Sequence, residues 1–181
     1  MKGIPYHILA CVCTVDGIDQ FCGGVNAPGL DRVLHITCED QVDTIPAATA
    51  DTHLIEDDIE MRASAVGPPA VTAGVFYPWY FSKEDMSYES TRDENGEWTT
   101  VVKIFMLQLA AEKTYVLNGM TGDNGICIVK DRNGQQRLIG GLGNGCNIGV
   151  KEQTNPKNGY EVTINWKSAH APYYYTGAVT V

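Results

Sequence analysis

The sequence lacks any apolar run as long as the roughly 18 residues that a membrane-spanning helix requires, so we expect no membrane partner. It also contains no GxSxG, HExxH or CxxC motif, which are local signatures of serine hydrolases, zinc proteases and thiol oxidoreductases. The four histidines are dispersed, and a Cys–His hydrolase would need the fold to bring its residues together. We therefore predict a protein that is not an enzyme and that holds neither a cofactor nor a metal ion.

Positive charge is scarce. Lysine and arginine number 13 against 22 aspartates and glutamates, which gives a net charge of −9 and a pI of about 4.8. This balance argues against nucleic-acid binding by neutralisation of phosphates. An acidic surface keeps a protein soluble, and it also suits a wall past which DNA must slide without sticking.

The sequence contains cysteines but no CxxC pair. Six cysteines stand at positions 11, 13, 22, 38, 127 and 146 of a chain that is long for a disulfide framework. The first four lack the paired spacing of a zinc knuckle, so a thiolate metal site is only a minor alternative. Cys127 lies inside an apolar strand-like run, which predicts a buried free thiol.

The N-terminus carries a short apolar run, Ile8–Cys13, after Lys2. Pro5 and His7 interrupt this region and no small-residue cleavage site follows, so a signal peptide is a poor description. We expect a first strand here instead.

The rest of the chain reads as strands joined by turns. The 19 glycines and the many β-branched residues favour β structure, and 181 residues favour one domain, 1–181. Asn133-Gly134 between two β-prone runs predicts a hairpin over 126–141. Strands are expected at 32–38, 98–107, 148–152, 160–166 and 173–181, and helical spacing predicts one helix over 109–120. The fold class is therefore mainly β with one helix (α+β), built as a β-sandwich or half-barrel.

The stretch 51–61 carries a local acidic cluster. If it forms a strand, Glu56, Asp58 and Glu60 share one face and a largely apolar set shares the other. A calcium site would need the spaced oxygens and central glycine of an EF-hand loop, which are missing. A solvated acidic face is the expected outcome.

Residues 64–98 look least like core, and we expect them to form a long inserted loop or arm. Pro68-Pro69 cannot continue a strand ladder, and a concentrated set of aromatic residues follows. That set is Phe76, Tyr77, Trp79, Tyr80 and Phe81. Such a loop either reaches a neighbouring subunit, since tyrosine and tryptophan are enriched at interfaces, or folds back over its own sheet.

The glycine-rich stretch 140–145 resembles a phosphate loop only superficially. No Lys-Ser/Thr follows it and no strong helix opens behind it, so neither a Walker A motif nor a dinucleotide fingerprint is present. A bend where two backbones pass closely is the expected role.

Taken in order, these motifs resemble a known family. The Asp131-x-x-Gly134 turn, the Leu138-x-Gly140 that follows, and the strand opened by Asn158-Gly159-Tyr160 are similar to structural proteins of tailed bacteriophages, especially those of Bacteroidetes phages. The order of elements also resembles the tail-tube fold. The likeness covers roughly 98–181, with weaker support at 29–62.

The resemblance implies a non-enzymatic virion subunit, made in the host cytoplasm, that assembles with itself into stacked rings and contacts other virion proteins. DNA would only pass through the tube, past an acidic face at Glu56, Asp58 and Glu60. The arm at 64–98 would mediate self-association through its aromatics. A head–tail connector or ring protein and a fibre domain are alternatives within the same class.

A different class also fits the aromatic residues. Tyr77, Trp79, Tyr80, Phe81 and Tyr173–Tyr175 could stack on sugars or line a peptide groove, which would make the chain a β-sandwich binding module for carbohydrate or peptide. Oligomeric state separates the two classes, because a binding module is expected to be a monomer.

Overall fold

The computed structural model describes residues 29–49, 52–64, 73–82, 86–120 and 122–181. The strand expected near residue 8, the thiols Cys11, Cys13 and Cys22, and the Pro68-Pro69 dipeptide all lie outside the described residues. The expectations about them therefore stay predictions.

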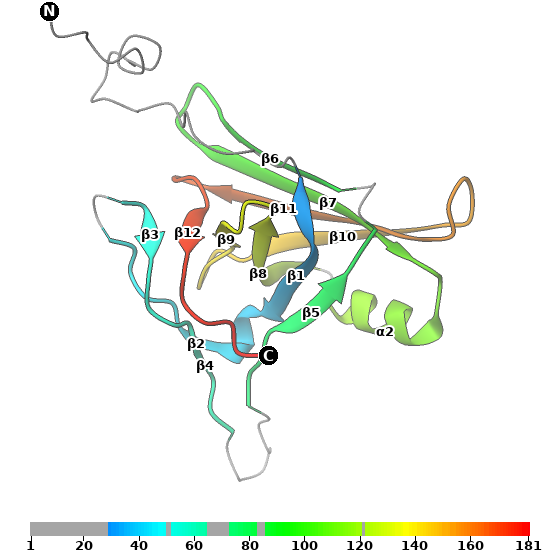
Figure 1. The fold of residues 1–181 in the computed structure, drawn as a ribbon, viewed down its shortest axis with the longest axis horizontal. Helices are drawn as coiled ribbons and strands as arrows, with labels where there is room; N and C mark the ends of the chain where they lie inside the picture. The colour runs from blue at the N-terminus through cyan, green and yellow to red at the C-terminus, as the bar shows by residue number, and fades with distance from the viewer. Residues whose placement is uncertain (1–28, 50–51, 65–72, 83–85, 121) are drawn as a thin grey trace, which may run out of the picture.

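The described chain is mainly β with a single α-helix, as the sequence predicts (Figure 1). In chain order the elements are β1 (Leu30–Cys38), the 3-10 turn η1 (Glu39–Gln41), β2 (Val42–Thr44), β3 (Leu54–Ile55), β4 (Glu60–Met61), β5 (Tyr77–Tyr80), β6 (Ser87–Arg92), β7 (Trp98–Leu107), α2 (Ala111–Gly119), β8 (Gly122–Asp131), β9 (Gln136–Ile139), β10 (Cys146–Gln153), β11 (Gly159–Ser168) and β12 (Tyr173–Tyr175).

The strands form two layers, which confirms a sandwich-like architecture. One layer has the order β5-β1-β8-β9-β12-β3 and the other has the order β10-β11-β7-β6. All pairs are antiparallel except β12 with β3, which are parallel, so the sheet is mixed. In Figure 1 the second layer runs across the top and the first layer lies beneath it.

The strand β8 links the two layers. Its start pairs with β10, while residues 127–130 pair with β9 and its other edge pairs with β1. Gly140 makes this crossing possible, because a Cβ there would lie 2.6 Å from the carbonyl oxygen of Gly125. Gly140 also has φ of +93°, a region that residues with a Cβ rarely adopt. The close backbone approach expected for the glycine-rich stretch is thus confirmed at Gly140.

The main core lies between the layers and follows from strand alternation. On β11, the side chains of Tyr160, Val162, Ile164 and Trp166 all point inward and are buried, as their spacing predicts. They meet apolar residues of β1, β5, β7, β8 and β10, together with Leu117 of α2. A second cluster covers the opposite face of the first layer, where Phe76, Ile128 and Tyr175 pack beneath β2, β4 and the C-terminal segment.

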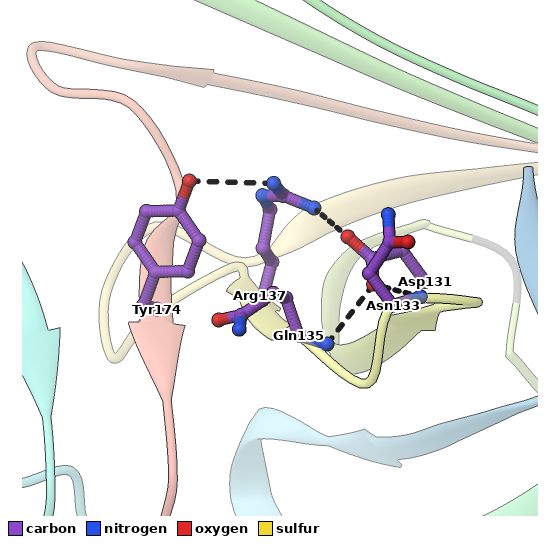
Figure 2. Close-up of polar contacts among 5 residues, drawn as sticks. All are labelled: Asp131, Asn133, Gln135, Arg137 and Tyr174. Atoms are coloured by element: carbon purple, nitrogen blue, oxygen red, sulfur yellow. Dashed lines mark hydrogen bonds and ion pairs between the residues drawn. The ribbon is translucent and has the colours of Figure 1, made fainter. Parts of the chain in front are cut away.

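The β8–β9 and β6–β7 hairpins turn in the same way. In the β8–β9 turn, one oxygen of Asp131 accepts hydrogen bonds from the backbone N–H groups of Asn133 and Gln135, each at 2.9 Å (Figure 2). Gly134 follows with φ of +87°. Asp93 repeats the pattern in the β6–β7 turn, accepting from Asn95 and Glu97 at 2.9 and 2.8 Å. The shared Asp-x-Asn-Gly sequence therefore encodes a turn in which aspartate satisfies two backbone donors.

Three segments differ from the sequence prediction. The expected loop 64–98 contains β5 and β6, because alternating residues there bury side chains in the sheet: Trp79 and Phe81 belong to the main core. The expected strand over 51–61 is broken into β3 and β4, with residues 56–59 outside both. The predicted closing strand 173–181 is also shorter, since β12 ends at Tyr175.

Candidate interaction groove

The five aromatic residues at 76–81 lie in and next to strand β5, where some are buried and the others are exposed on opposite faces of the sheet. Phe76, Trp79 and Phe81 are buried, so three of the five predicted self-association residues are core. Tyr77 and Tyr80 remain exposed, at 48% and 67%. Because side chains alternate along a strand, Tyr77 lies on the same side of the sheet as Trp79, whereas Tyr80 lies on the other side.

The helix α2 packs loosely beside β5 (Figure 1). Within α2 only Leu117 is buried, while Tyr115 is 83% and Val116 is 49% exposed. Hydrogen bonds also hold the start of the helix, where the hydroxyl of Tyr160 bonds Thr114 Oγ1 at 2.7 Å and the backbone of Ala110 at 3.0 Å. This arrangement leaves an apolar helix face uncovered within the part of the chain that the structure describes.

Between β5 and α2 lies a groove of about 790 Å³, which we call the β5–α2 groove. Its lining includes Ile36, Tyr77, Trp79, Tyr115, Val116 and Met120. Trp79 also borders a smaller adjoining cavity of about 220 Å³ that reaches Met106 and Leu117. Among the described residues that line the larger groove there is no aspartate, glutamate, lysine, arginine or histidine, whereas Glu112 and Lys113 border the smaller cavity. The larger groove can therefore bury apolar surface of a partner.

The backbone edge of β5 is poorly suited to the addition of another strand. Pro78 stands inside β5 and has no N–H to donate. The neighbouring donors are already used, since the N–H of Phe76 bonds Thr180 O at 2.8 Å and that of Ser82 bonds Phe105 O at 2.8 Å. A partner would therefore contact the side chains of the β5–α2 groove rather than extend this edge. Among the described strands, β6 ends the other layer with six residues that pair only with β7.

The predicted acidic face does not form as a strand face. Glu56 and Asp58 lie in the connection between β3 and β4, and Glu60 lies in β4; all three are exposed. Two of the carboxylates bond residues of other segments instead: Asp58 accepts the backbone N–H of Ala178 at 2.6 Å, and Glu60 accepts the hydroxyl of Thr44 at 2.6 Å. The three acidic residues are thus exposed, but they do not alternate along one strand as the sequence suggested.

Two further clusters join residues that the sequence could not connect. The rings of His53 and His170 flank Tyr173, each with its centroid 4.3 Å from the tyrosine ring, and both imidazoles lie within hydrogen-bond distance of Ala171 O. Arg137 lies 5.3 Å from the ring of Tyr88 and 4.9 Å from that of Tyr174. Tyr174 is its partner across the β9–β12 pair, whereas Tyr88 belongs to β6 of the other layer.

The Arg137 cluster is structural. The guanidinium also contacts the Asp131 carboxylate at 3.4 Å and the Tyr174 hydroxyl at 3.3 Å (Figure 2). Burial of Tyr88 raises the pKa of its phenol, opposed in part by the nearby Arg137 charge. The cluster ties β6, β8, β9 and β12 together.

The thiols behave as the strand pattern predicts for Cys127. Cys127 and Cys146 are free and buried together in the main core. A hydrogen bond with Cys146, followed by burial, raises the pKa of the Cys127 thiol well above its ordinary value. No group of three or more histidine, cysteine, aspartate or glutamate side chains among the described residues is arranged to hold a metal ion.

Within the described residues, no helix has the length and apolar character needed to cross a bilayer. Comparison with known proteins gives no relative: no family model, curated protein or solved structure matches the chain. The β5–α2 groove is therefore interpreted from its own geometry.

Proposed function

We propose that the chain is a non-enzymatic structural subunit of a tailed-bacteriophage virion, namely a tail tube protein that assembles with itself into stacked rings. The observation that carries the proposal is the β5–α2 groove. It leaves Tyr77, Tyr115 and Val116 exposed around Trp79, and apolar patches of this kind mark interfaces in soluble proteins. The sandwich architecture and the turn motifs shared with phage structural proteins support the same class.

The charge of the molecule is consistent with a conduit for DNA. The net charge of −9 disfavours retention of phosphates, and the exposed Glu56, Asp58 and Glu60 are candidates for the luminal wall. Within the ring, β6 offers an unpaired edge to a neighbouring subunit. The subunit would be made in the bacterial cytoplasm and become part of the virion, with itself and other virion proteins as partners.

Self-assembly is tested by sedimentation velocity across a concentration series, with negative-stain electron microscopy of the same samples. Rings or tubes with a central hole are expected, and their symmetry distinguishes a tail tube from a head–tail connector. The substitution V116E places a charge in the groove, whereas L142E places the same charge at a similarly exposed residue elsewhere, 46% against 49%. V116E should abolish assembly and L142E should preserve it.

A monomer at every concentration would overturn the proposal and favour the binding-module class. Equal loss of assembly in V116E and L142E would mean that added negative charge, not the groove, sets the outcome. Far-ultraviolet circular dichroism of both variants checks that the fold is retained.

A further inference from the structure

A second groove lies on the opposite side of the β1–β5 pair. Its volume is about 530 Å³, and it occupies the part of the first layer's outer face that the second core cluster does not cover. We call it the outer-face groove. Along β1 the outward side chains change from the buried Thr37 through the half-buried His35 and Val33 to the exposed Asp31. The segments β2, β4 and the C-terminal residues therefore cover the outer face of β1 near Thr37 but leave the end near Asp31 exposed.

The floor of this groove is a row of side chains across four strands. Tyr80 pairs with Val33, and Lys130 pairs with Gln136. Strand β1 lies between β5 and β8, and Leu34 pairs with Val129, the residue before Lys130; the register of β1 with β8 shifts between Leu30 and Leu34. The charge of Lys130 reaches His35 of β1. Neighbouring strands are about 4.8 Å apart, so Tyr80 and Gln136 are separated by roughly three such steps, or about 14 Å.

The chemistry along this row combines an aromatic surface with hydrogen-bonding groups. Tyr80 is 67% exposed at one end, and Lys130, Gln136 and His35 supply donors and acceptors toward the other end. Val181 of the C-terminal segment contributes to the wall, held in place because Thr180 O accepts the Phe76 N–H at 2.8 Å. A ligand lying here would cross the strands and contact side chains rather than backbone.

The side-chain charges of the described residues that line the groove balance. Among these residues Lys130 contributes one positive charge, Asp31 contributes one negative charge, and Gln136 is uncharged. Asp31 is directed to the N–H of Arg32 at 2.8 Å rather than to an ion pair with Lys130. Balanced charge, a flat exposed ring and spaced hydrogen-bonding groups match a neutral polyhydroxyl ligand.

We propose that the outer-face groove binds a neutral oligosaccharide, with one sugar ring stacked on Tyr80 and the hydroxyls of the next units bonded by His35, Lys130 and Gln136. The site differs from the β5–α2 groove, and the proposal does not rest on self-assembly. Sugar binding at this groove is compatible both with a subunit on the surface of a virion and with a monomeric binding domain.

The test is isothermal titration calorimetry of the full chain with tetrasaccharides of glucose, β-linked and α-linked, and of N-acetylglucosamine. Trigalacturonate and hexaglutamate serve as charged probes. We expect at least one neutral probe to bind with Kd below about 1 mM, the range of a weak but specific site. Y80A should weaken that binding about tenfold, as loss of an aromatic stack does, and K130Q should weaken it less.

Matched variants locate the site. Tyr77 is exposed on the other face of β5 and Lys103 is exposed on β7, so Y77A and K103Q should leave the affinity unchanged. Absence of binding by every neutral probe, or equal effects of Y80A and Y77A, would overturn the proposal. Binding of only the charged probes would also overturn it, because it would mark Lys130 as a simple electrostatic contact. V116E should bind sugar normally, so failure of assembly and failure of this site remain distinguishable.

Discussion

At the residue scale, single side chains in this molecule act largely by satisfying backbone groups. Asp131 accepts two N–H groups of its own turn and contacts Arg137 as well. Asp93 makes the same two turn contacts, but no ion pair of Asp93 with another described residue accompanies them. The two hairpins therefore offer a natural comparison of one turn with and without its added charge contact.

We expect D131A to lower the free energy of unfolding by about 1–3 kcal/mol, the sum of two modest hydrogen bonds and a partly exposed ion pair. D93A should cost less, because only the turn contacts are lost. Urea denaturation of both variants measures the difference. D131N is the control, since it keeps one oxygen acceptor while removing the charge. Equal costs for D131A and D93A would show that the Arg137 contact contributes nothing.

The pH dependence of stability should contain a contribution from His35. Burial, with the nearby charge of Lys130 as the second cause, lowers the pKa of His35 below its ordinary value of 6.5. As the pH falls through 6.5, the unfolded chain takes up the proton before the folded chain does, so stability falls. We expect H35Q to lose less stability than the parent between neutral pH and the range just below the ordinary histidine pKa. K130Q should raise the His35 pKa, which NMR titration of the imidazole measures.

The surroundings of individual side chains were only partly predictable from the sequence. The burial of the Cys127 thiol was predicted correctly, because a cysteine inside an apolar strand is buried together with its apolar neighbours. The separation of Tyr77 from Tyr80 follows from alternation only once 76–81 is known to be a strand. The contact between His53 and Ala171 joins residues 118 positions apart, and no local pattern encodes such a distance.

At the element scale, Gly140 lies against the backbone of β8 at the point where β8 passes from one layer to the other. A Cβ at Gly140 would meet backbone atoms at 2.6 and 3.2 Å, whereas a Cβ at Gly141 meets nothing within 4 Å. G140A should therefore destabilise the fold by about 2 kcal/mol or more, through a positive φ and a clash with backbone. G141A is the matched control and should change stability by less than about 0.5 kcal/mol. Thermal unfolding of both variants decides whether the crossing is as tight as the distances indicate.

The helix α2 depends on one residue far more than on its neighbours. Leu117 is 2% exposed and lies in the main core, while Val116 is half exposed beside it. L117A should cost about 2–5 kcal/mol, as other buried leucine truncations do. V116A should cost well under 1 kcal/mol, since little buried area is lost. If V116A proved equally costly in a dilute monomer, the β5–α2 groove would be closed in solution and unavailable to a partner.

Elements with strong local signals were predicted well, and those shaped by distant contacts were not. The strands over 98–107 and 160–166, the hairpin at Asn133-Gly134 and the single helix all appear near their expected places. The segment 76–81 was expected in a loop because Pro68-Pro69 cannot continue a strand ladder. Pairing with β1 overrides that preference. The strand expected over 51–61 did not form as one element, and two of its carboxylates bond residues of other segments, Ala178 and Thr44.

At the scale of the whole molecule, the sandwich class was predictable but its connections were not. The sequence pattern supplies strands with one buried face, which need a second layer. It does not say that β8 serves both layers, or that the two exposed tyrosines of β5 open onto separate grooves. Those features depend on register, and register is fixed by contacts between strands that are far apart in the chain.

Assembly through the β5–α2 groove should strengthen with salt. The chain carries a net charge of −9, so copies repel one another at low ionic strength, while none of the described residues that line the groove is charged. Raising the salt from about 0.01 M to about 0.5 M shortens the Debye length from roughly 30 Å to a few ångströms. The repulsion is then screened and the apolar contact is not weakened. Sedimentation velocity should show larger species at high salt for the parent chain and L142E, but not for V116E. Dissociation on adding salt would instead mean that ion pairs hold the subunits together, and the groove would lose its role in assembly.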